Sequence, residues 1–496
     1  MSLIRFVRAN AARELRPNFV VRASVNAIAI VMAALTVATA ARAQSGAVQK
    51  PITPAQQLAR DVYKELVEIN TMDSVGSTTK AVEAMAARFR NAGFPAKDID
   101  VLIPAGKPTK GNLVVRYHGR TPGKGVLLLA HLDVVAALKT DWSRDPFQLQ
   151  EANGFFYGRG ASDDKSMASM FVANMLTYKK EGWVPEHDLI IALTTDEEGG
   201  GDNGVQWLIA NHRDKIDALY AINEGGGGTL EGQKPLFHSV QAAEKVPVNL
   251  TLTVLNSGGH SSVPRPDNAI YALADGLAKL SRYTFPVALN AVSKPFFEQT
   301  AKVEKPEIAA AMRAIVVNPN DKAAQDVLGK DPRYSSMLRT TCVATRLFGG
   351  HANNALPQTA TANVNCRIVP TSTFEEVKAT LARVMGDTSI KITGESKEKF
   401  GVTPNAIDAT LLSSTTALTK KMWGDIPVIP TMSTGATDGR FLRAVGIPTY
   451  GVSGIFAVPG ETNAHGRDEK LRVKSYYDGL DFLYQLVKQV AGGTKM

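Results

Sequence analysis

The sequence predicts an α/β fold, with a mixed, mainly parallel sheet covered by helices and a smaller α+β lid domain inserted into it. Three observations carry this prediction. Short, wholly apolar runs alternate with segments of helical spacing in the first half of the chain, as buried parallel strands and their connecting helices do. After Val246 the strands alternate between apolar and polar residues, and the first pattern resumes near Pro404. The length of 496 residues also favours two domains over one.

The first expected elements are two helices. Ala55–Ile69 and Lys80–Asn91 have helical apolar spacing, and Gly93 ends the second. Buried strands and helices are then expected to alternate, at Val126–Ala130, Ser166–Lys179, Leu189–Leu193, Gly204–Asn211 and Leu219–Ile222. This alternation predicts the main sheet.

The middle of the chain is expected to form the lid. Its predicted elements are a strand at Pro247–Leu255, a helix at Asn268–Leu280, two strands at Thr340–Phe348 and Thr359–Val369, a helix at Phe374–Met385 and a strand near Ser389–Thr393. Phe285–Tyr334 is a charged segment punctuated by prolines. We therefore expect a catalytic domain in two parts (residues 50–245 and 405–494) around a lid and dimerisation domain (246–404) with an insertion (285–334).

The last part of the chain returns to short apolar runs. Val428–Pro430 and Thr449–Val452 are the expected strands, and Lys474–Val490 is the expected final helix. They complete the catalytic domain in this prediction.

The N-terminus (residues 1–43) is typical of a signal peptide. Arginines precede an apolar stretch from Ala27 to Ala41, and Ala41–Ala43 fits a small-x-small cleavage site. The stretch is interrupted by threonines and is shorter than the ~20 residues that a membrane-spanning helix needs. We therefore expect export, cleavage near Ala43, a periplasmic or secreted protein and no stable membrane insertion.

The net charge gives little support to nucleic-acid binding. Residues 1–43 hold six arginines and one glutamate, so cleavage would lower the formal charge from +9 to about +4. The rest of the chain has no Lys/Arg-rich run interleaved with aromatic residues. We expect a small-molecule substrate and no nucleic-acid partner.

The chain has two cysteines, Cys342 and Cys366, too few for a zinc-ribbon site. Both lie in expected strands of a hairpin whose loop is centred near Asn354, about opposite each other. In an oxidising compartment they could form a disulfide. Two reduced thiols remain the alternative. The separation of the Cα atoms decides whether a disulfide can form.

Each of the three apolar strands in the first half runs into residues that can bind metal. His131 and Asp133 follow the first strand, Glu197 and Glu198 the second, and Glu224 the third. The carboxyl ends of parallel strands converge on one crevice. Two adjacent glutamates after a buried strand are costly unless positive charge lies nearby, and a pair of cations would supply it.

Each motif has an ordinary interpretation when taken alone. A histidine at a strand end is more often a hydrogen-bonded residue than a ligand, and paired acids usually form a solvated turn. Asp163 and Asp164 precede a predicted helix, where an aspartate N-cap is expected. The functional interpretation is a carboxylate that bridges two cations, and Asp163 fits it better than Asp164.

Taken in order, the motifs resemble the dinuclear zinc amidohydrolases and peptidases that include acetylornithine deacetylase, succinyl-diaminopimelate desuccinylase, aminoacylase, glutamate carboxypeptidase and carboxypeptidase S. The resemblance spans about residues 55–490. The motifs that carry it are His131–Asp133, Gly158–Lys165, Glu197–Gly199, Glu224, Gly259–Ser262, Asn354–Pro357, Arg367, Thr437–Arg440 and His465-Gly466. The ordered set is specific, although no single motif is.

The resemblance implies a metallopeptidase or amidohydrolase that cleaves an amide bond of a dipeptide, a peptide C-terminus or an N-acyl amino acid. It implies two zinc ions, with cobalt or manganese as possible substitutes for these nitrogen and oxygen ligands. One ion would be held by His131, Asp163 and Glu224, and the other by Asp163, Glu198 and His465.

The resemblance also implies the catalytic roles. Glu197 would act as general base for a metal-bound hydroxide and pass the proton to the leaving nitrogen. Asp133 would orient His131. His260 would stabilise the developing oxyanion, often in a neighbouring subunit's active site, while Asn354 and Arg367 would bind substrate.

Other residues receive no catalytic role. Thr437–Arg440 is interpreted as partly structural. The remaining histidines are interpreted as ordinary surface or loop residues, namely His118, His187, His212, His238 and His351.

Three questions stay open at this level. The long N-terminal lead, the enlarged lid and residues 463–470 resemble the carboxypeptidase S and N-acyl amino acid hydrolase branch. Among enzymes, the alternative to a carboxypeptidase is a dipeptidase or an N-acyl-amino-acid amidohydrolase. From another class, the chain could be an exported protein that binds a peptide or amino-acid derivative without turnover, although an intact Glu197 argues against this. A homodimer through the lid is also possible.

Overall fold

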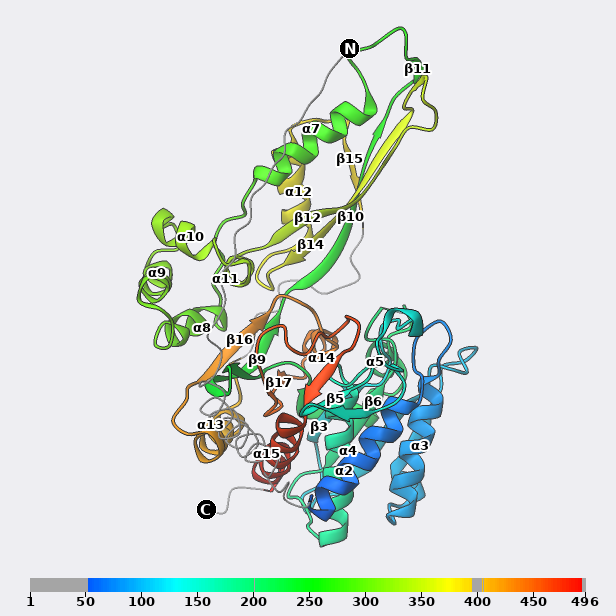
Figure 1. Cartoon of the computed structure of the whole chain (residues 1–496), viewed down its shortest axis with the longest axis vertical. Helices are drawn as coiled ribbons and strands as arrows, with labels where there is room; N and C mark the ends of the chain where they lie inside the picture. The colour runs from blue at the N-terminus through cyan, green and yellow to red at the C-terminus, as the bar shows by residue number, and fades with distance from the viewer. Residues whose placement is uncertain (1–51, 200, 395–403, 405, 493–496) are drawn as a thin grey trace, which may run out of the picture. The chain divides into compact units, whose positions relative to one another are not determined.

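The computed structural model describes residues 52–199, 201–394, 404 and 406–492 (Figure 1). The predicted signal peptide lies outside these residues. In this part of the chain, no helix is both long and apolar enough to cross a membrane.

The main sheet has ten strands in the order β1-β2-β6-β3-β7-β17-β9-β8-β18, with β16 paired to β9. At its centre β6, β3, β7 and β17 are parallel, whereas β1, β2 and β9 make antiparallel pairs. The strands are β1 (Ile99–Leu102), β2 (Asn112–Tyr117), β3 (Gly125–His131), β6 (Leu189–Thr194), β7 (Ala218–Asn223), β8 (Gly227–Glu231), β9 (Lys234–Glu244), β16 (Val428–Ser433), β17 (Thr449–Gly451) and β18 (Phe456–Ala457). The predicted mixed, mainly parallel sheet is confirmed.

Helices cover both faces of this sheet (Figure 1). Leu128 and Ile191 point to one face, and Leu127 and Ile190 point to the other, because successive side chains of a strand alternate. The first face packs against α2 (Pro54–Glu68), α3 (Thr78–Asn91), α4 (Lys165–Glu181), α13 (Ala409–Trp423) and α15 (Val473–Ala491). The second packs against α5 (Gly204–Asn211), α6 (Arg213–Ile216) and α14 (Gly439–Ala444). Burial on both faces explains the wholly apolar strands.

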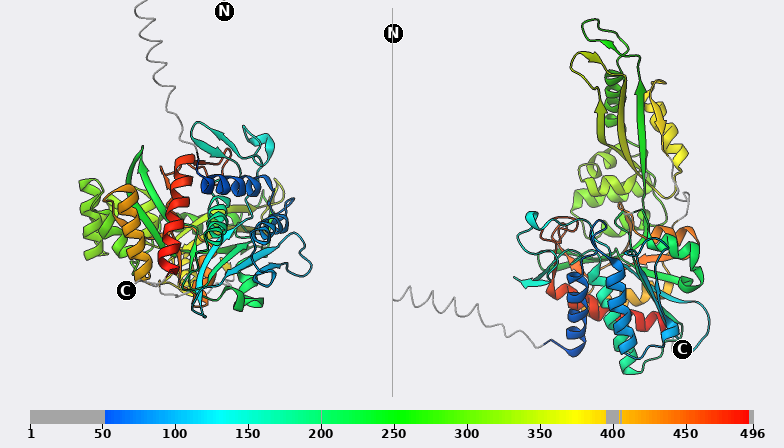
Figure 2. Two further views of the ribbon diagram at one scale, coloured as in Figure 1. Left: turned by 90° about the horizontal axis from the view of Figure 1, so that it is seen from below. Right: turned by 90° about the vertical axis from the view of Figure 1, so that its right-hand side faces the viewer.

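Chain segments far apart in sequence meet on the first face. The helix α4 contacts both α2 and α15, near the two ends of the described chain (Figure 2). The ring of Tyr63 on α2 stacks on that of Tyr476 on α15, with centroids 4.7 Å apart. A separate three-stranded sheet, β19-β5-β4, joins β4 (Gln150–Ala152) and β5 (Phe155–Tyr157) to β19 (Lys470–Arg472).

A second sheet, in the order β12-β14-β10-β15, is antiparallel throughout. It consists of β10 (Val246–Leu255), β12 (Thr341–Gly349), β14 (Thr359–Ile368) and β15 (Lys391–Thr393). The helices α7 (Ala269–Arg282) and α12 (Phe374–Met385) pack on one face and share its apolar cluster. The alternating pattern after Val246 is thus that of a sheet covered on one side.

The two cysteines form a disulfide. Cys342 on β12 pairs directly with Cys366 on β14, with their Cα atoms 4.0 Å apart. This resolves the alternative that the sequence left open, because the strand register brings the two thiols together.

The segment between residues 285 and 334 is more regular than the sequence predicted. It contains α8 (Ser293–Thr300), α9 (Pro306–Val317), α10 (Lys322–Leu328) and the start of α11 (Pro332–Leu338). Pro306 and Pro332 each begin a helix, where the missing N–H costs nothing. The apolar cluster of these helices takes in Phe237 of β9 and Ile429 of β16. The segment therefore packs against the main sheet, while the predicted domain boundaries stay a prediction.

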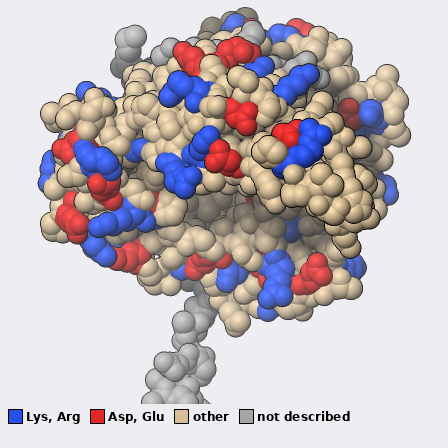
Figure 3. All heavy atoms as spheres, turned by 90° about the horizontal axis from the view of Figure 1, so that it is seen from above, with Lys and Arg blue, Asp and Glu red and all other residues tan. Residues whose placement is uncertain are grey.

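Charges of both signs are interspersed on the surface seen in Figure 3. Exposed ion pairs occur among the described residues, such as Lys322 with Asp326 on α10.

Candidate metal centre

The central strands of the main sheet end at one edge. β3 lies between β6 and β7, and its last residue, His131, pairs with Thr194 at the end of β6. Glu197 and Glu198 follow β6, and Glu224 follows β7 directly. The parallel order therefore brings the three sequence motifs together at the carboxyl ends of neighbouring strands.

Asp163 lies between two histidines. Its Oδ1 is 3.0 Å from Nε2 of His131, and its Oδ2 is 3.2 Å from Nε2 of His465. Asp163 belongs to the loop before α4, and His465 to the loop between β18 and β19. The carboxylate thus has one oxygen toward each histidine. This is the position expected of a ligand that bridges two cations.

Two glutamates complete this cluster. Oε1 of Glu198 is 3.1 Å from Nε2 of His465, and Oε2 of Glu224 is 4.0 Å from Nε2 of His131. Glu197 also offers an oxygen within 4.8 Å of ligand atoms from His131 and Glu224. Distance alone therefore does not separate Glu197 from the five predicted ligands, and the division of roles stays a prediction.

The spacing of these atoms fits metal binding. Two ligand atoms on one tetrahedral zinc ion lie about 3.3 Å apart, because zinc–nitrogen and zinc–oxygen distances are about 2.0–2.2 Å. The separations of 3.0, 3.1 and 3.2 Å around Asp163 and His465 match this value. Nitrogen and carboxylate oxygen donors suit zinc, cobalt or manganese.

The charge balance also favours cations. Burial raises the pKa of Glu197 to about 8 and raises the pKa of Glu224 well above its usual value. Burial opposes ionisation of Asp163 as well, yet hydrogen bonds from His131 and His465 hold its pKa low. The cluster gathers more partly buried carboxylates than its two histidines can neutralise, and divalent ions would supply the missing positive charge.

Asp133 connects the two strand ends. Its main-chain oxygen is 3.0 Å from Nδ1 of His131, while its carboxylate is 3.6 Å from the same nitrogen. The carboxylate oxygens accept hydrogen bonds from the backbone N–H groups of Glu197 (3.1 Å) and Glu198 (2.9 Å). Asp133 thus orients His131 mainly through its backbone and holds the glutamate loop with its side chain.

The glutamate loop has a second anchor that the sequence interpretation did not name. Lys110, almost fully buried, forms ion pairs with Asp73 and with Asp196. Asp196 has a positive φ of 58°, directly before Glu197. Its other carboxylate oxygen accepts a hydrogen bond from the N–H of Asp202 at 3.1 Å. A lone lysine gives no sequence signal for this role.

A buried ion pair connects the loops of Asp163 and His465. Nη1 of Arg159 donates to Oε2 of Glu469 at 2.7 Å, and both side chains are within 2% of complete burial. Glu469 also accepts hydrogen bonds from the backbone N–H groups of Gly160, Ser162 and Asp163, at 3.1, 2.6 and 3.0 Å. Nη2 of Arg159 donates to the backbone oxygen of Gly466 at 2.8 Å. The pair thereby positions Asp163 against His465.

Arg159 and Glu469 lie within the sequence motifs, but no role was predicted for them. Their separation by 310 residues hides the pairing. A signal was present, because Glu469 follows His465 by four residues in a loop near a predicted site.

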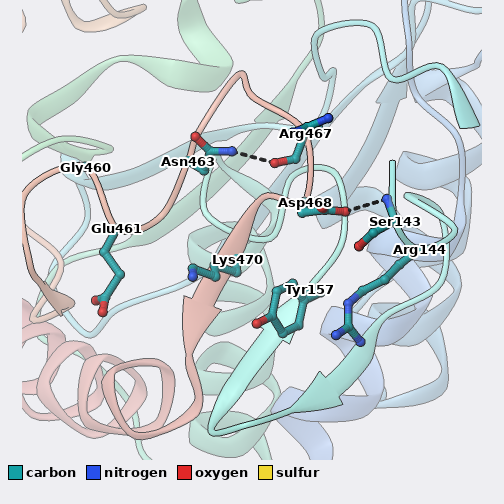
Figure 4. Close-up of a pocket in the computed structure, with 9 residues that line it drawn as sticks. All are labelled: Ser143, Arg144, Tyr157, Gly460, Glu461, Asn463, Arg467, Asp468 and Lys470. Carbon is teal, nitrogen blue, oxygen red and sulfur yellow. Dashed lines mark hydrogen bonds between the residues drawn. The ribbon is translucent and has the colours of Figure 1, made fainter. Parts of the chain in front are cut away.

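The loop of His465 has an unusual backbone. Asn463, His465 and Asp468 all have positive φ angles, of 53°, 61° and 54°. Asparagine, histidine and aspartate are the non-glycine residues that tolerate this region best. Figure 4 shows two contacts that hold the loop: Nδ2 of Asn463 donates to the oxygen of Arg467, and Asp468 accepts from the N–H of Ser143 at 2.9 Å.

Asp164 does not cap the helix with its side chain, contrary to the ordinary interpretation of this motif. It occupies the N-cap position of α4, but its side chain makes no capping hydrogen bond. It is buried, its Oδ2 has no hydrogen-bond partner among the described residues, and burial raises its pKa well above the usual value. A cavity of about 260 Å³ lies here, lined among others by Asp163, Asp164 and Glu224.

The predicted substrate residues of the lid do not form one cluster. His260 in β11 (Gly259–His260) pairs with Ala355 in β13 (Ala355–Leu356), and the oxygen of Asn354 accepts from the N–H of Ser261 at 2.9 Å. Arg367 instead pairs with Pro247 at the opposite end of β10. From Pro247 to Leu255 the strand spans roughly 26 Å, at about 3.3 Å per residue. A single chain therefore places His260 and Asn354 far from Arg367.

Arg367 lies in a positively charged environment. Burial, and then the charge of Arg440, lowers its pKa. The pKa of nearby Lys245 is lowered to about 7, mainly by burial and to a smaller extent by the positive charges of Arg367 and Arg339. An anionic group would be favoured here, although neither Lys245 nor Arg339 was singled out from sequence.

Two other interpretations can be compared with the structure. Asp438, within Thr437–Arg440, is buried and its Oδ1 accepts from Nδ2 of Asn203 at 2.6 Å. His238 was predicted to be a surface or loop residue, and this was wrong. It is fully buried in β9, because its ring packs against Trp423, Phe456 and Phe482.

Comparison with known proteins identifies the family. Residues 127–489 match the model of peptidase family M20/M25/M40. The chain belongs to this family. The matched segment covers more than half of the sequence and includes every predicted metal ligand. The resemblance inferred from the motifs is confirmed, and the chain is an amide-bond hydrolase by family.

Among M20 relatives, the mouse N-fatty-acyl-amino acid synthase/hydrolase PM20D1 is 26% identical over 86% of this chain and 87% of its own. The probable carboxypeptidase S-like 2 of Dictyostelium discoideum is 27% identical over 74% of this chain and 71% of its own.

Solved structures of M20 proteins share the fold. An M20 family metallo-carboxypeptidase, Sso-CP2 of Sulfolobus solfataricus, has a TM-score of 0.64 at 19% identity and covers 87% of this chain and 98% of its own. YXEP of Bacillus subtilis, described as a dinuclear metal binding peptidase, has a TM-score of 0.55 at 10% identity and covers 88% of this chain and 98% of its own.

Proposed function

We propose that this M20 protein is a two-metal hydrolase that cleaves the amide bond of an N-acyl amino acid, a dipeptide or a peptide C-terminus. The observation that carries the proposal is the position of Asp163, with one carboxylate oxygen toward His131 and the other toward His465. The name of the mouse relative supports N-acyl amino acids, and that of the Dictyostelium relative supports a peptide C-terminus.

One ion would be held by His131, Asp163 and Glu224, and the other by Asp163, Glu198 and His465. Zinc is the proposed metal, with cobalt or manganese as substitutes. When bound, such ions polarise a scissile carbonyl and make water more acidic. The likeness to the dinuclear YXEP structure supports the proposed number of ions.

Glu197 would move the proton. Its carboxylate lies beside the cluster, and its backbone N–H is held by Asp133 at 3.1 Å. Burial raises the pKa of Glu197 to about 8 without bound cations, and nearby positive charge lowers the pKa of a carboxyl group. A pKa near neutrality suits a group that takes a proton from the attacking water and returns it to the leaving nitrogen.

The lid would complete the site from two chains. Arg367 would bind a substrate carboxylate through its planar guanidinium. His260 and Asn354 would come from the lid of a partner subunit, because one chain places them far from Arg367. The exposed edge strand β12 supports a homodimer through the lid: Val343 is 61% exposed and Leu347 is 63% exposed.

The protein would act outside the cytoplasm, in the periplasm or after secretion. The signal-peptide pattern of residues 1–43 carries this part of the proposal. The disulfide between Cys342 and Cys366 supports it, because such bonds persist in oxidising compartments.

A hydrolysis screen tests the function. Purified protein is assayed against dipeptides, N-acyl amino acids and peptides with free C-termini, before chelation, after chelation and after zinc is restored. We expect at least one class to be hydrolysed, activity to disappear with chelation, and zinc to restore it. Zinc-loaded, folded protein that hydrolyses none of them would instead support the binding protein without turnover.

A further inference from the structure

A second, larger cavity lies between the inserted helices and the main sheet. Its volume is about 840 Å³, and α8 and α11 face β8, β9 and β16 across it. This volume is in the range of pockets that bind small ligands, about 300–1,000 Å³. Its apolar lining includes Leu230, Leu236, Phe237, Phe296, Met337 and Met432. The size and lining favour an apolar ligand.

Of the three charged side chains that line this cavity, Glu231, Glu304 and Arg333, the last two have hydrogen-bond partners. Nε and Nη2 of Arg333 donate to the two oxygens of Asp331, at 3.2 and 2.7 Å. The hydroxyl of Tyr334 donates to Glu304. Because Asp331 neutralises Arg333, the lining offers no free positive charge to an anionic ligand.

The apolar cavity adjoins the cavity of the metal centre. Gly228 and Ala457 line the metal-centre cavity, and their chain neighbours Thr229 and Val458 line the apolar one. These residues belong to or directly follow the paired strands β8 and β18. Consecutive Cα atoms are only about 3.8 Å apart. The two cavities therefore border the same pair of strands.

Gln241 gives a second connection. It lines the apolar cavity, and its side chain lies against Gly225, which lines the metal-centre cavity. A Cβ atom added to Gly225 would come within 2.4 Å of Oε1 of Gln241. The glycine thus leaves room for this side chain between residues that line the two cavities.

We propose that the apolar cavity binds the long acyl chain of an N-acyl amino acid whose amide bond lies at the metal centre. This proposal rests on the proposed hydrolase function and deepens it, because it assigns the acyl chain to the inserted helices. Each buried methylene contributes about 0.8 kcal/mol, which corresponds to about a fourfold gain in kcat/KM. Selectivity for long chains would therefore come from α8 and α11.

The test measures kcat/KM for one amino acid acylated with chains from acetyl to palmitoyl, below the concentration at which they form micelles. We expect kcat/KM to rise as the chain lengthens. Hydrolysis of the acetyl substrate with no rise for longer chains would overturn the acyl-chain proposal but leave the hydrolase function intact. Hydrolysis of dipeptides with no N-acyl substrate accepted would overturn both the acyl-chain proposal and this substrate class.

Two variants test whether the dependence of kcat/KM on acyl-chain length arises in the apolar cavity. Ser336→Trp fills the cavity from α11, and Leu236→Gln makes its β9 wall polar. Each is expected to lower kcat/KM for the palmitoyl substrate by about tenfold or more, with the acetyl substrate changed less than about twofold. The matched control is Val317→Trp, at the end of α9, where the side chain is 86% exposed and outside the cavity.

Variants that keep the wild-type circular dichroism spectrum give the decisive comparison. If Ser336→Trp does not fold, Leu236→Gln alone decides. Equal effects on the acetyl and palmitoyl substrates, or no effect on either, would overturn the proposal.

Discussion

Replacing the carboxylate of Glu197 by an amide separates proton transfer from metal binding. Glu197→Gln should lower kcat/KM by about 10²–10⁴-fold, the usual contribution of a general base, because an amide cannot carry the proton. Metal content should stay unchanged, since the proposed ligands are intact. Steady-state kinetics and metal analysis of the same preparation check this expectation.

Glu307→Gln is the matched control, because Glu307 is exposed in the first turn of α9. It should leave both quantities unchanged. A Glu197→Gln protein that loses its metal along with activity would show that Glu197 is a ligand instead.

His238 makes a specific prediction about pH. Burial lowers its pKa from 6.5 to about 3. Between these values the unfolded chain binds a proton that the folded chain does not, so the free energy of unfolding falls as pH decreases. This one group contributes about 1.4 kcal/mol per pH unit.

His238→Phe should therefore flatten the dependence of stability on pH between 6.5 and 3, measured by urea unfolding at several pH values. His351→Gln serves as the control, because His351 is exposed. An unchanged pH slope in His238→Phe would contradict a neutral, buried imidazole.

At the level of single elements, the sequence predicted the centre of the main sheet well. The wholly apolar run before His131 is enough to identify β3, because a strand buried on both faces consists almost entirely of apolar residues. The ligand motifs could be predicted for the same reason, since they follow such strands directly.

Other elements gave no comparable signal. The helices α9 and α11 were missed because Pro306 and Pro332 look like helix breakers, although each stands at the first helical position. The Arg159–Glu469 pair was missed because a contact between distant loops leaves no periodic pattern. The fold of buried strands is thus encoded locally, whereas the positioning of the site depends on contacts between distant segments.

The disulfide between β12 and β14 should stabilise the smaller sheet. It closes a loop with a sequence separation of 24 residues, for which chain entropy gives about 3 kcal/mol. Replacing both Cys342 and Cys366 by alanine should lower the free energy of unfolding by about this amount in urea. The oxidised wild type and the wild type with reductant are the controls, and the latter should resemble the variant. Equal stability of all three would show that the bond contributes nothing.

At the scale of the whole molecule, the edge strand β12 makes a prediction about assembly. Its exposed apolar residues Val343, Leu347 and Phe348 would be covered in a dimer related by two-fold symmetry. Leu347→Lys should shift the protein from dimer to monomer, as measured by light scattering after gel filtration. It should also reduce activity, because His260 would no longer reach the partner's site.

Val317→Lys is the control for this prediction, since Val317 is also exposed but lies on α9. A wild-type protein that is monomeric and active would contradict the two-chain site.

In the proposed function, turnover depends on two ions held around Asp163. The most direct test of this dependence is a titration of the chelated protein with zinc, in which bound metal and hydrolysis rate are measured at each step. We expect activity to reach its maximum at about two ions per chain. Full activity without metal, or at one ion per chain with no further gain, would contradict it.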